Sequence, residues 1–170
     1  MRLVGYRNNE PEVSKIDSLS ELQELRRSGS IDCIVDENIE APRSFFHVRL
    51  LEKGINIGIV SAGIGHNTGI VNLGMLTLVY NDQQWHTFDI SGHLLNNGRC
   101  DGIIYEIAPS HNGFIVIHEI GAKKFSLDGK CLWKIDSGLV ENHRIDEDSL
   151  VLLSDGIATS FDKESGKKKG

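Results

Sequence analysis

The 170-residue chain lacks any run of about eighteen or more apolar residues, so it contains no segment suited to a transmembrane helix. Its first ten residues also lack the apolar core of a secretory signal peptide. The three cysteines, Cys33, Cys100 and Cys131, are far apart, and none belongs to a CxxC pair. This usage is typical of reduced thiols rather than of a disulfide framework or a thiolate zinc site. We therefore expect a cytoplasmic protein that does not bind membranes.

Basic residues are in the minority. The chain has 18 lysines and arginines against 24 aspartates and glutamates, which gives a net charge of −6 at pH 7. Surfaces that bind nucleic acids or anionic membranes are basic, so this balance argues against both kinds of partner and favours a basic protein. The composition, with 39% hydrophobic and 25% charged residues, is that of an ordinary globular chain. We expect residues 1–170 to form a single domain.

Motifs for catalysis are missing too. The serines form no GxSxG elbow, and the glycine-rich segment 63–69 lacks both the GxGxxG spacing and a GK[ST] ending. The seven histidines are scattered, and the nearest pairs, seven residues apart, straddle expected turns instead of sharing one strand or helix. We therefore expect no enzyme activity, no metal and no cofactor.

The chain does contain a repeat. Three segments align on a phenylalanine followed by an acidic residue and a glycine, namely 87–92, 124–129 and 160–166. Their phenylalanines, Phe88, Phe125 and Phe161, are 37 and 36 residues apart, and a short apolar run begins eleven residues before each of them. Such a period is typical of a chain built from one supersecondary unit whose copies stack on one another.

The middle copy predicts four antiparallel strands, at 102–107, 114–118, 122–127 and 131–135. Asp128-Gly129 between the last two is a strong hairpin signal, because glycine accepts the positive φ that a tight turn requires. The last copy follows the same plan with its final strand nearly missing, and the first copy, around 75–90, is irregular. Four such strands in one period are the geometry of a propeller blade or of a β-sandwich meander.

The N-terminal third predicts one short α-helix, from Ser18 to Ser28. Ser18 and Glu21 have the spacing of a capping box, and Gly29 offers a C-terminal stop. Leucines recur every three residues along it, a narrow stripe that predicts packing on the edge or end of a sheet. Strands are expected at 31–35 and 45–51.

The predicted fold is therefore mainly β, with about three imperfect four-stranded antiparallel blade-like repeats and one short N-terminal α-helix. Residues 1–54 hold the helix and the first strands, and residues 55–170 hold the β repeats. With three blades, the repeats form a partial propeller or a β-sandwich, since closed propellers have roughly four to eight.

The last repeat resembles a known blade signature. Ser160-Phe161-Asp162-Lys163-Glu164-Ser165-Gly166 is similar to the Ala-x-Asp-x-x-Thr-Gly motif of quinoprotein-type (PQQ-like) β-propellers. Trp133, four residues after Gly129, stands where that family places its docking tryptophan. The resemblance covers about residues 75–170 and implies blade architecture. The quinone and metal of the family's enzymes are not expected, because the chain has neither an export signal nor enough blades to enclose them.

The function that these features favour is non-enzymatic binding of another, basic protein. The acidic residues of one expected linker can attract such a partner, and an exposed tryptophan can anchor it. The expected contact residues are Glu141, Asp146, Glu147, Asp148 and Trp85. The sharpest form of this hypothesis is a bacterial immunity protein that covers the active site of a basic toxin, for example a nuclease.

Two other functions stay open. A small-ligand or carbohydrate-binding β module would expose Trp85, Trp133 and Tyr105 on one platform. A metal- or histidine-dependent hydrolase would have a pocket in which His66, His86 or His118 meets an acidic residue.

Overall fold

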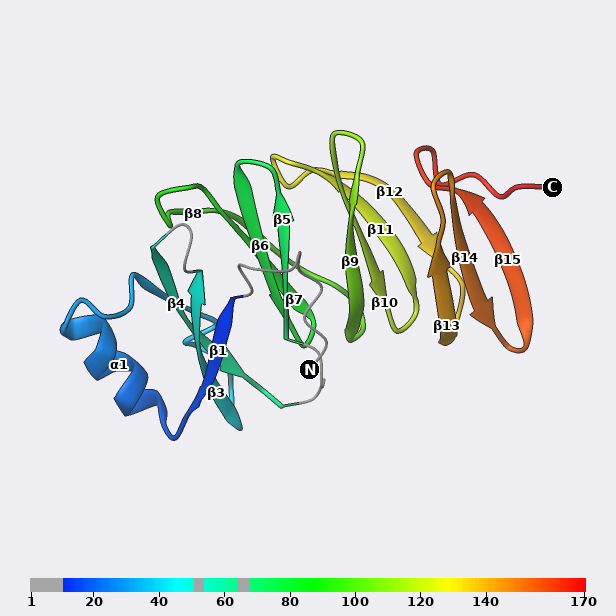
Figure 1. Cartoon of the computed structure of the whole chain (residues 1–170). Helices are drawn as coiled ribbons and strands as arrows, with labels where there is room; N and C mark the ends of the chain where they lie inside the picture. The colour runs from blue at the N-terminus through cyan, green and yellow to red at the C-terminus, as the bar shows by residue number, and fades with distance from the viewer. Residues whose placement is uncertain (1–10, 51–53, 64–67) are drawn as a thin grey trace.

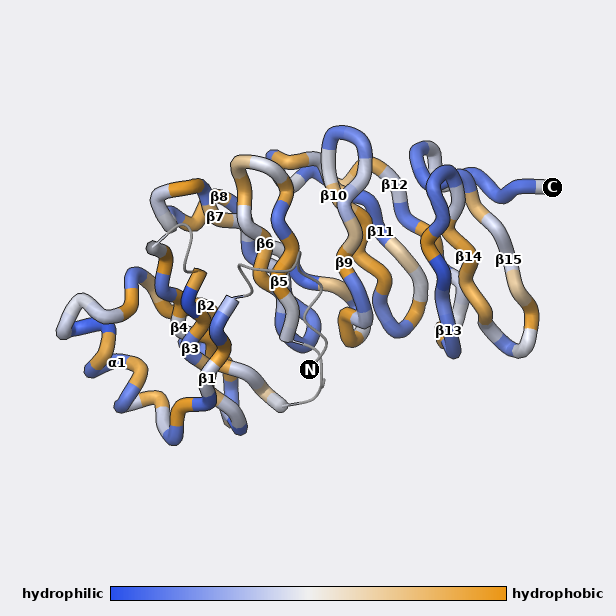
Figure 2. The backbone as a smooth tube through the Cα atoms, viewed as in Figure 1, coloured by the Kyte–Doolittle hydropathy of each residue, from blue (hydrophilic) through white to orange (hydrophobic). Residues whose placement is uncertain are grey.

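The computed structural model describes residues 11–50, 54–63 and 68–170, and it shows a mainly β fold as the sequence predicts. In these ranges the strands form four sheets that stand in a row, and α1 covers the N-terminal end of the row (Figure 1). Hydrophobic stretches lie within the strands, and several of the turns, such as the one between β9 and β10, are hydrophilic (Figure 2). The expected architecture of blade-like antiparallel sheets is confirmed.

The first sheet, here called the N-terminal sheet, has the strand order β1-β3-β4-β2. Its strands are β1 (Glu12–Ile16), β2 (Cys33–Val35), β3 (Ser44–Leu50) and β4 (Ile55–Ser61). β2 runs parallel to β4, and the other pairs are antiparallel. Since β3 and β4 pair along their whole length, the expected division at residue 54 falls inside this sheet, and the blades begin later.

The helix α1 (Leu19–Arg27) begins and ends as predicted. The Ser18 hydroxyl accepts a bond from the Glu21 backbone N–H at 3.2 Å, and the Glu21 carboxylate accepts one from the Asp17 N–H at 3.2 Å. Gly29 follows the helix with a φ of +78°. Leu22 is fully buried against the outer face of the N-terminal sheet. No helix in the described part of the chain is long and apolar enough to span a lipid bilayer.

The other three sheets are antiparallel meanders, here called the first, second and third blades. The first blade consists of β5 (Gly69–Leu73), β6 (Leu76–Asn81), β7 (Gln84–Phe88) and β8 (Leu94–Arg99). The second consists of β9 (Ile104–Ser110), β10 (Gly113–His118), β11 (Gly121–Ser126) and β12 (Cys131–Asp136). The third consists of β13 (Val140–Ile145), β14 (Ser149–Ser154) and β15 (Ile157–Asp162).

These blades confirm most of the predicted strands. The second blade has its four strands and the Asp128-Gly129 hairpin, in which Gly129 adopts a φ of +81°. The third blade has three strands, and residues 167–169 run back along the end of β15 through backbone bonds. The first copy is more regular than predicted, because β5 and β8 complete it to four strands.

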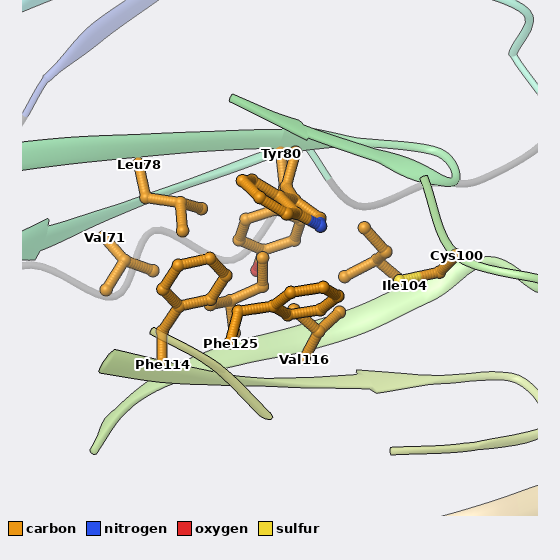
Figure 3. Close-up of a cluster of buried hydrophobic side chains, with 10 residues drawn as sticks. Val71, Leu78, Tyr80, Cys100, Ile104, Phe114, Val116 and Phe125 are labelled. Atoms are coloured by element: carbon orange, nitrogen blue, oxygen red, sulfur yellow. The ribbon is translucent and has the colours of Figure 1, made fainter. Parts of the chain in front are cut away.

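Successive side chains along a blade strand point alternately to the preceding sheet and to the following sheet of the row. Val79 and Phe88 of the first blade join the core against the N-terminal sheet. Leu78 and Tyr80 (Figure 3), together with Trp85, join the core against the second blade. The same alternation continues between the second and third blades. Because the first and second blades are each covered on both faces, their middle strands β6 and β10 are buried along almost their whole length.

The turn after β15 ties the third blade to the second. A side-chain carbon added at Gly166 would lie 2.8 Å from the Trp133 ring, so only glycine lets the indole pack there. The indole Nε1 donates to the Glu164 carbonyl oxygen at 3.0 Å, and the Glu164 carboxylate pairs with the buried Lys124 amine. Trp133 thus joins neighbouring blades, as the motif resemblance implies.

Aspartates hold the turns that follow the repeat phenylalanines. The Asp89 carboxylate accepts bonds from the Ser91 hydroxyl at 2.7 Å, from the Ser91 N–H at 2.8 Å and from the His93 N–H at 3.0 Å. The Ser91 hydroxyl bond, followed by the His93 backbone bond, lowers the pKa of Asp89 to about 2. The Asp128 and Asp162 carboxyls also have lowered pKa values, chiefly because of hydroxyl bonds from nearby serines.

We expect these turns to weaken in acid. The folded pKa of Asp89 lies below its ordinary value of 3.8, so its stabilising contribution is complete above about pH 4 and is lost as the pH falls toward about 2. Asp89→Asn should therefore flatten the pH dependence of the urea midpoint over that interval and lower the midpoint at neutral pH. Urea titrations of both proteins at several pH values check this, and identical pH profiles would contradict it.

Candidate functional site

The four predicted acidic residues all lie on the third blade and are exposed. Asp146, Glu147 and Asp148 form the turn between β13 and β14, whereas Glu141 lies near the other end of β13. At the rise of an extended strand, five residues separate Glu141 from this turn by roughly 16 Å. The structure therefore brings three of the four together and places Glu141 apart from them.

The acidic turn also has basic neighbours. Arg144 Nη2 lies 3.0 Å from an Asp146 carboxylate oxygen. The Lys163 and Lys169 amines donate to the Asp146 and Asp148 carbonyls at 3.4 and 2.9 Å. Glu147 is exposed at the centre of the turn. The local negative charge is thus smaller than the sequence suggests, because the lysines of the C-terminal segment fold back toward it.

The prediction that Trp85 is an exposed anchor is wrong. Trp85 is 1% exposed and lies in the core between the first and second blades, where its ring contacts Phe114 and Phe125. Its position on β7 faces inward, like that of Ala122, which lies 37 residues later on β11. That equivalence could have been read from the repeat, and it is the signal that the sequence analysis missed.

The aromatic platform expected for carbohydrate binding is not formed. Trp85 is buried, Trp133 packs on Gly166, and Tyr105 stacks on His143 with ring centroids 6.4 Å apart. Trp85 lies in the core between the first and second blades, whereas Tyr105 and Trp133 pack against the core between the second and third blades, so a sugar could not lie across all three. The prediction of a shared platform is therefore wrong.

The outer face of the third blade is the uncovered end of the row. This face carries Val151 and Leu153, which alternate along β14 with the buried Leu150 and Leu152. It also carries Ala158 on β15, because Ala158 is the cross-strand partner of Leu153. Val151 and Leu153 are partly exposed, and Ala158 is exposed. The equivalent residues of the second blade, Ile115, Ile117 and Ala122, are fully buried.

The first blade shows the same relation. Its residues at these three positions, Leu78, Tyr80 and Trp85, are buried under the second blade. Three successive blades thus carry apolar side chains at the same repeat positions, and only in the third are they open to solvent in the described structure. The acidic residues of the sequence do not by themselves indicate that this apolar face is exposed.

A polar pocket of about 750 Å³, here called the junction pocket, lies between the N-terminal sheet and the first blade. The segment after β2, the β6–β7 turn and strands β7 and β8 line it. Its charged side chains and histidine are Asp36, Glu37, Glu40, Asp82, His86 and Arg99. No local signal in residues 36–42 connects them to β7.

A buried pair forms one wall of this pocket. His86 Nε2 lies 3.1 Å from an Asp36 carboxylate oxygen, and both side chains are about 95% buried. Asp36 adopts a φ of +60°, uncommon for a residue other than glycine. Nearby, the Asp82 carboxylate accepts bonds from the Ser61 hydroxyl at 2.9 Å and the Ala62 N–H at 3.0 Å, which joins the two sheets.

His86 is the histidine that meets an acidic residue in a pocket, as the hydrolase hypothesis requires. Its Nε2 is occupied by Asp36 and its Nδ1 is buried, so neither nitrogen can reach a substrate without movement of the ring. His118 is fully buried. Its pKa is lowered, chiefly by this burial and secondly by the positive charge of Lys123. His66 lies outside the described residues. The geometry therefore gives the hydrolase hypothesis little support.

Metal binding has no support in the described ranges either. No group of three or more histidine, cysteine, aspartate or glutamate side chains there is arranged to hold an ion. Burial is the main cause that raises the pKa of the Cys33 and Cys100 thiols to about 11 each, and it disfavours the thiolate form that binds metals.

Comparison with known proteins does not assign the chain to a family. No family model matches, and no curated protein matches. The WD40 domain of SCAP from fission yeast is 9% identical with a TM-score of 0.46, covering 74% of this chain and 38% of that one. KlAtg21, solved with the coiled-coil of AgAtg16, is 16% identical with a TM-score of 0.48, covering 98% and 55%.

The N-terminal domain of Nup159 is 13% identical with a TM-score of 0.46, covering 59% of this chain and 28% of that one. The chain thus spans about half or less of the length of these three structures. All three TM-scores are below 0.5, and the resemblance to quinoprotein-type propellers stays a prediction.

Proposed function

We propose that this chain is a protein-binding module whose partner docks on the outer face of the third blade. One observation carries the proposal: the apolar positions that each earlier blade buries under its neighbour are open on the last one. Val151, Leu153 and Ala158 offer a partner the same kind of contact that Ile115, Ile117 and Ala122 make inside the row. The chemistry that fits this face is an antiparallel sheet with an aliphatic and aromatic surface.

The acidic residues supply the rim of this face. The Asp146–Asp148 turn lies at one end of β13 and Glu141 near the other, so carboxylates flank the apolar residues. Protein interfaces combine an apolar centre with a polar rim, and rim charges mainly raise association rates and select the partner. A basic partner fits, and an immunity-type inhibitor that covers the active site of a basic toxin is the most specific form of the proposal.

The test compares an apolar-face variant with a matched control. Affinity capture with the full chain identifies a partner, and its dissociation constant is then measured with purified proteins. We expect Leu153→Asp to weaken binding at least about tenfold, because it places a charge at the centre of the contact. Leu132→Asp makes the same change on β12, where Leu132 is 48% exposed, and should leave the affinity unchanged.

Charge reversal tests the acidic rim. A variant with Glu141, Asp146, Glu147 and Asp148 replaced by lysine should slow association at low salt and have much less effect at high salt. Equal affinity of Leu153→Asp and the wild type would contradict docking on this face. Inhibition of the captured partner's nuclease activity, if it is a nuclease, separates the immunity form from simple binding.

A further inference from the structure

We propose that one rim of the first and second blades binds a short segment of another protein that carries aliphatic side chains and carboxylates. Four exposed aliphatic residues form this rim, here called the aliphatic rim: Ile90, Leu95, Leu127 and Leu132. They lie in the β7–β8 and β11–β12 turns and at the beginning of β8 and β12. These strands belong to other sheets than the outer face of the third blade, so the inference does not rest on the proposed function.

The two leucines on the strands are the extra residues of two equivalent β-bulges. Leu95 is skipped in the pairing of β7 with β8, which shifts its register at this residue. Leu132, 37 residues later, is skipped in the same way in the pairing of β11 with β12. A bulge breaks the alternation of a strand and re-aims a side chain. The side chains of Leu95 and Leu132 are 47% and 48% exposed at these bulges.

The two turn residues follow the same period. Ile90 and Leu127 are also 37 residues apart, and they are 56% and 41% exposed. The β11–β12 turn packs on β8, since a side-chain carbon added at Gly129 would lie 3.3 Å from the Asn96 side chain. Both turns lie on the same side of the row (Figure 1). A single exposed aliphatic residue is ordinary, but a patch that crosses two neighbouring blades is typical of an interaction surface.

The blade fold does not require aliphatic side chains at these positions. In the third blade, the segment that runs back along the repeat phenylalanine Phe161 consists of three lysines, Lys167, Lys168 and Lys169. This segment is the counterpart of the beginning of β8 and β12. Leucines that are half exposed gain only part of the free energy of burial, and cover by a partner would supply the rest.

The charges beside the rim favour an acidic partner. Lys167 and Lys168 are exposed, and in the described ranges the lysines that pair with carboxylates are Lys123, Lys124 and Lys134 instead. The residues after β15 lie on the same side of the row as the two turns (Figure 1). A segment that covers the rim can therefore place carboxylates beside these two ammonium groups.

The acidic side chains of the turn after β15 are already engaged. The Glu164 carboxylate pairs with Lys124, and the Asp162 carboxylate accepts bonds from the Ser165 hydroxyl and N–H, at 2.7 Å each. Neither of them forms an ion pair with Lys167 or Lys168 in the part of the chain that the structure describes.

An anionic membrane fits this surface less well than a protein segment. The rim has no tryptophan or tyrosine, the residues that gather at lipid interfaces. A flat anionic surface would also meet Asp89 and Asp128, which lie in the same two turns. A segment of a protein can place its carboxylates beside the lysines alone.

The experiment selects a probe with the full chain. A displayed library of random short peptides is panned on the wild-type protein, and the most enriched peptide is synthesised. We expect enriched peptides to combine leucine, isoleucine or valine with aspartate or glutamate. The same peptide with its acidic residues changed to asparagine or glutamine is the control ligand and should bind more weakly at low salt.

Matched variants locate the peptide. A protein with both Leu95→Asp and Leu132→Asp should bind it at least about tenfold more weakly, because two charges then lie in the apolar contact. Lys167→Gln with Lys168→Gln should weaken binding roughly fivefold at low salt and less at high salt. Leu153→Asp, on the third blade, should bind like the wild type. Equal thermal unfolding midpoints show that the variants fold.

The proposal is overturned if no peptide is enriched, if the enriched peptides are basic or lack aliphatic residues, or if the double aspartate variant binds like the wild type. Vesicles of phosphatidylcholine and phosphatidylserine test the lipid alternative. Vesicle binding that the double aspartate variant loses, without peptide enrichment, would assign the rim to membranes instead. Leu132→Asp and Leu153→Asp exchange their roles between this test and that of the third blade, so the two proposals fail independently.

Discussion

Replacing Trp85 with alanine should lower the free energy of unfolding by about 3–5 kcal/mol, the range for removing a large buried aromatic side chain. The indole belongs to the buried core between the first and second blades. Its ring centroid lies 5.0 Å from that of Phe114 in an edge-on arrangement and 4.9 Å from that of Phe125. Gly98 on β8 lies beneath it, since a side-chain carbon added there would come within 2.4 Å of the ring. Truncation therefore leaves a cavity between two sheets that both depend on this contact.

Urea unfolding measures this loss. Far-ultraviolet circular dichroism is the signal to follow, because the variant lacks one of the two tryptophans and its fluorescence is not comparable with that of the wild type. Leu132→Ala is the control, since Leu132 is about half exposed on β12 and its truncation should cost less than about 1 kcal/mol. A Trp85→Ala protein as stable as the control would mean that the first and second blades do not share this core.

Gly121→Ala should be a strongly damaging single-methyl addition in the second blade. Gly121 opens β11 with a φ of +146°, a conformation that residues with a side chain rarely adopt. A carbon added there would lie 2.0 Å from the Ile135 carbonyl oxygen, which is backbone of the paired strand β12 and cannot rotate away. We expect a loss on the order of 3 kcal/mol or more, because backbone strain and strand displacement add together.

The control separates these two causes. Gly74 also has a positive φ, of +69°, but a carbon added there meets no atom within 4 Å. Gly74→Ala should therefore cost only the conformational part, about 1–2 kcal/mol. Thermal or urea unfolding of both variants gives the comparison, and equal losses would show that the approach to Ile135 does not matter.

Local chemistry explains why the predicted strands of the second blade were right. The Asp128-Gly129 turn and the alternation of β11 act over a few residues, and the structure has the hairpin where the turn residues stand. The helix is a similar case. Ser18 accepts the bond that the capping box predicts, Glu21 reaches back to the Asp17 N–H next to it, and Gly29 follows the helix with a positive φ. The first blade is predicted to be irregular around residues 75–90, whereas in the structure β5 and β8 complete it to four strands.

The wrong and missing predictions concern which face of a strand is buried and which distant residues that face contacts. Trp85 was expected at the surface, yet the period places it at the same position as the buried Ala122. The junction pocket could not be foreseen, because the Asp36–His86 contact joins residues 50 positions apart on different sheets. Periodicity identifies equivalent positions but says nothing of contacts between the non-repeating N-terminal sheet and the first blade.

By itself, the sequence determined the repeated strands, their turns and the capped helix, since turn residues, alternation and capping pairs act through neighbours along the chain. Only the tertiary structure decided that α1 covers one end of the row while Val151, Leu153 and Ala158 stay open at the other. Only it decided that the carboxylates divide between the junction pocket and the third blade. The physical reason is that burial and net charge depend on which sheets stack on each other, and that order arises from contacts between distant residues.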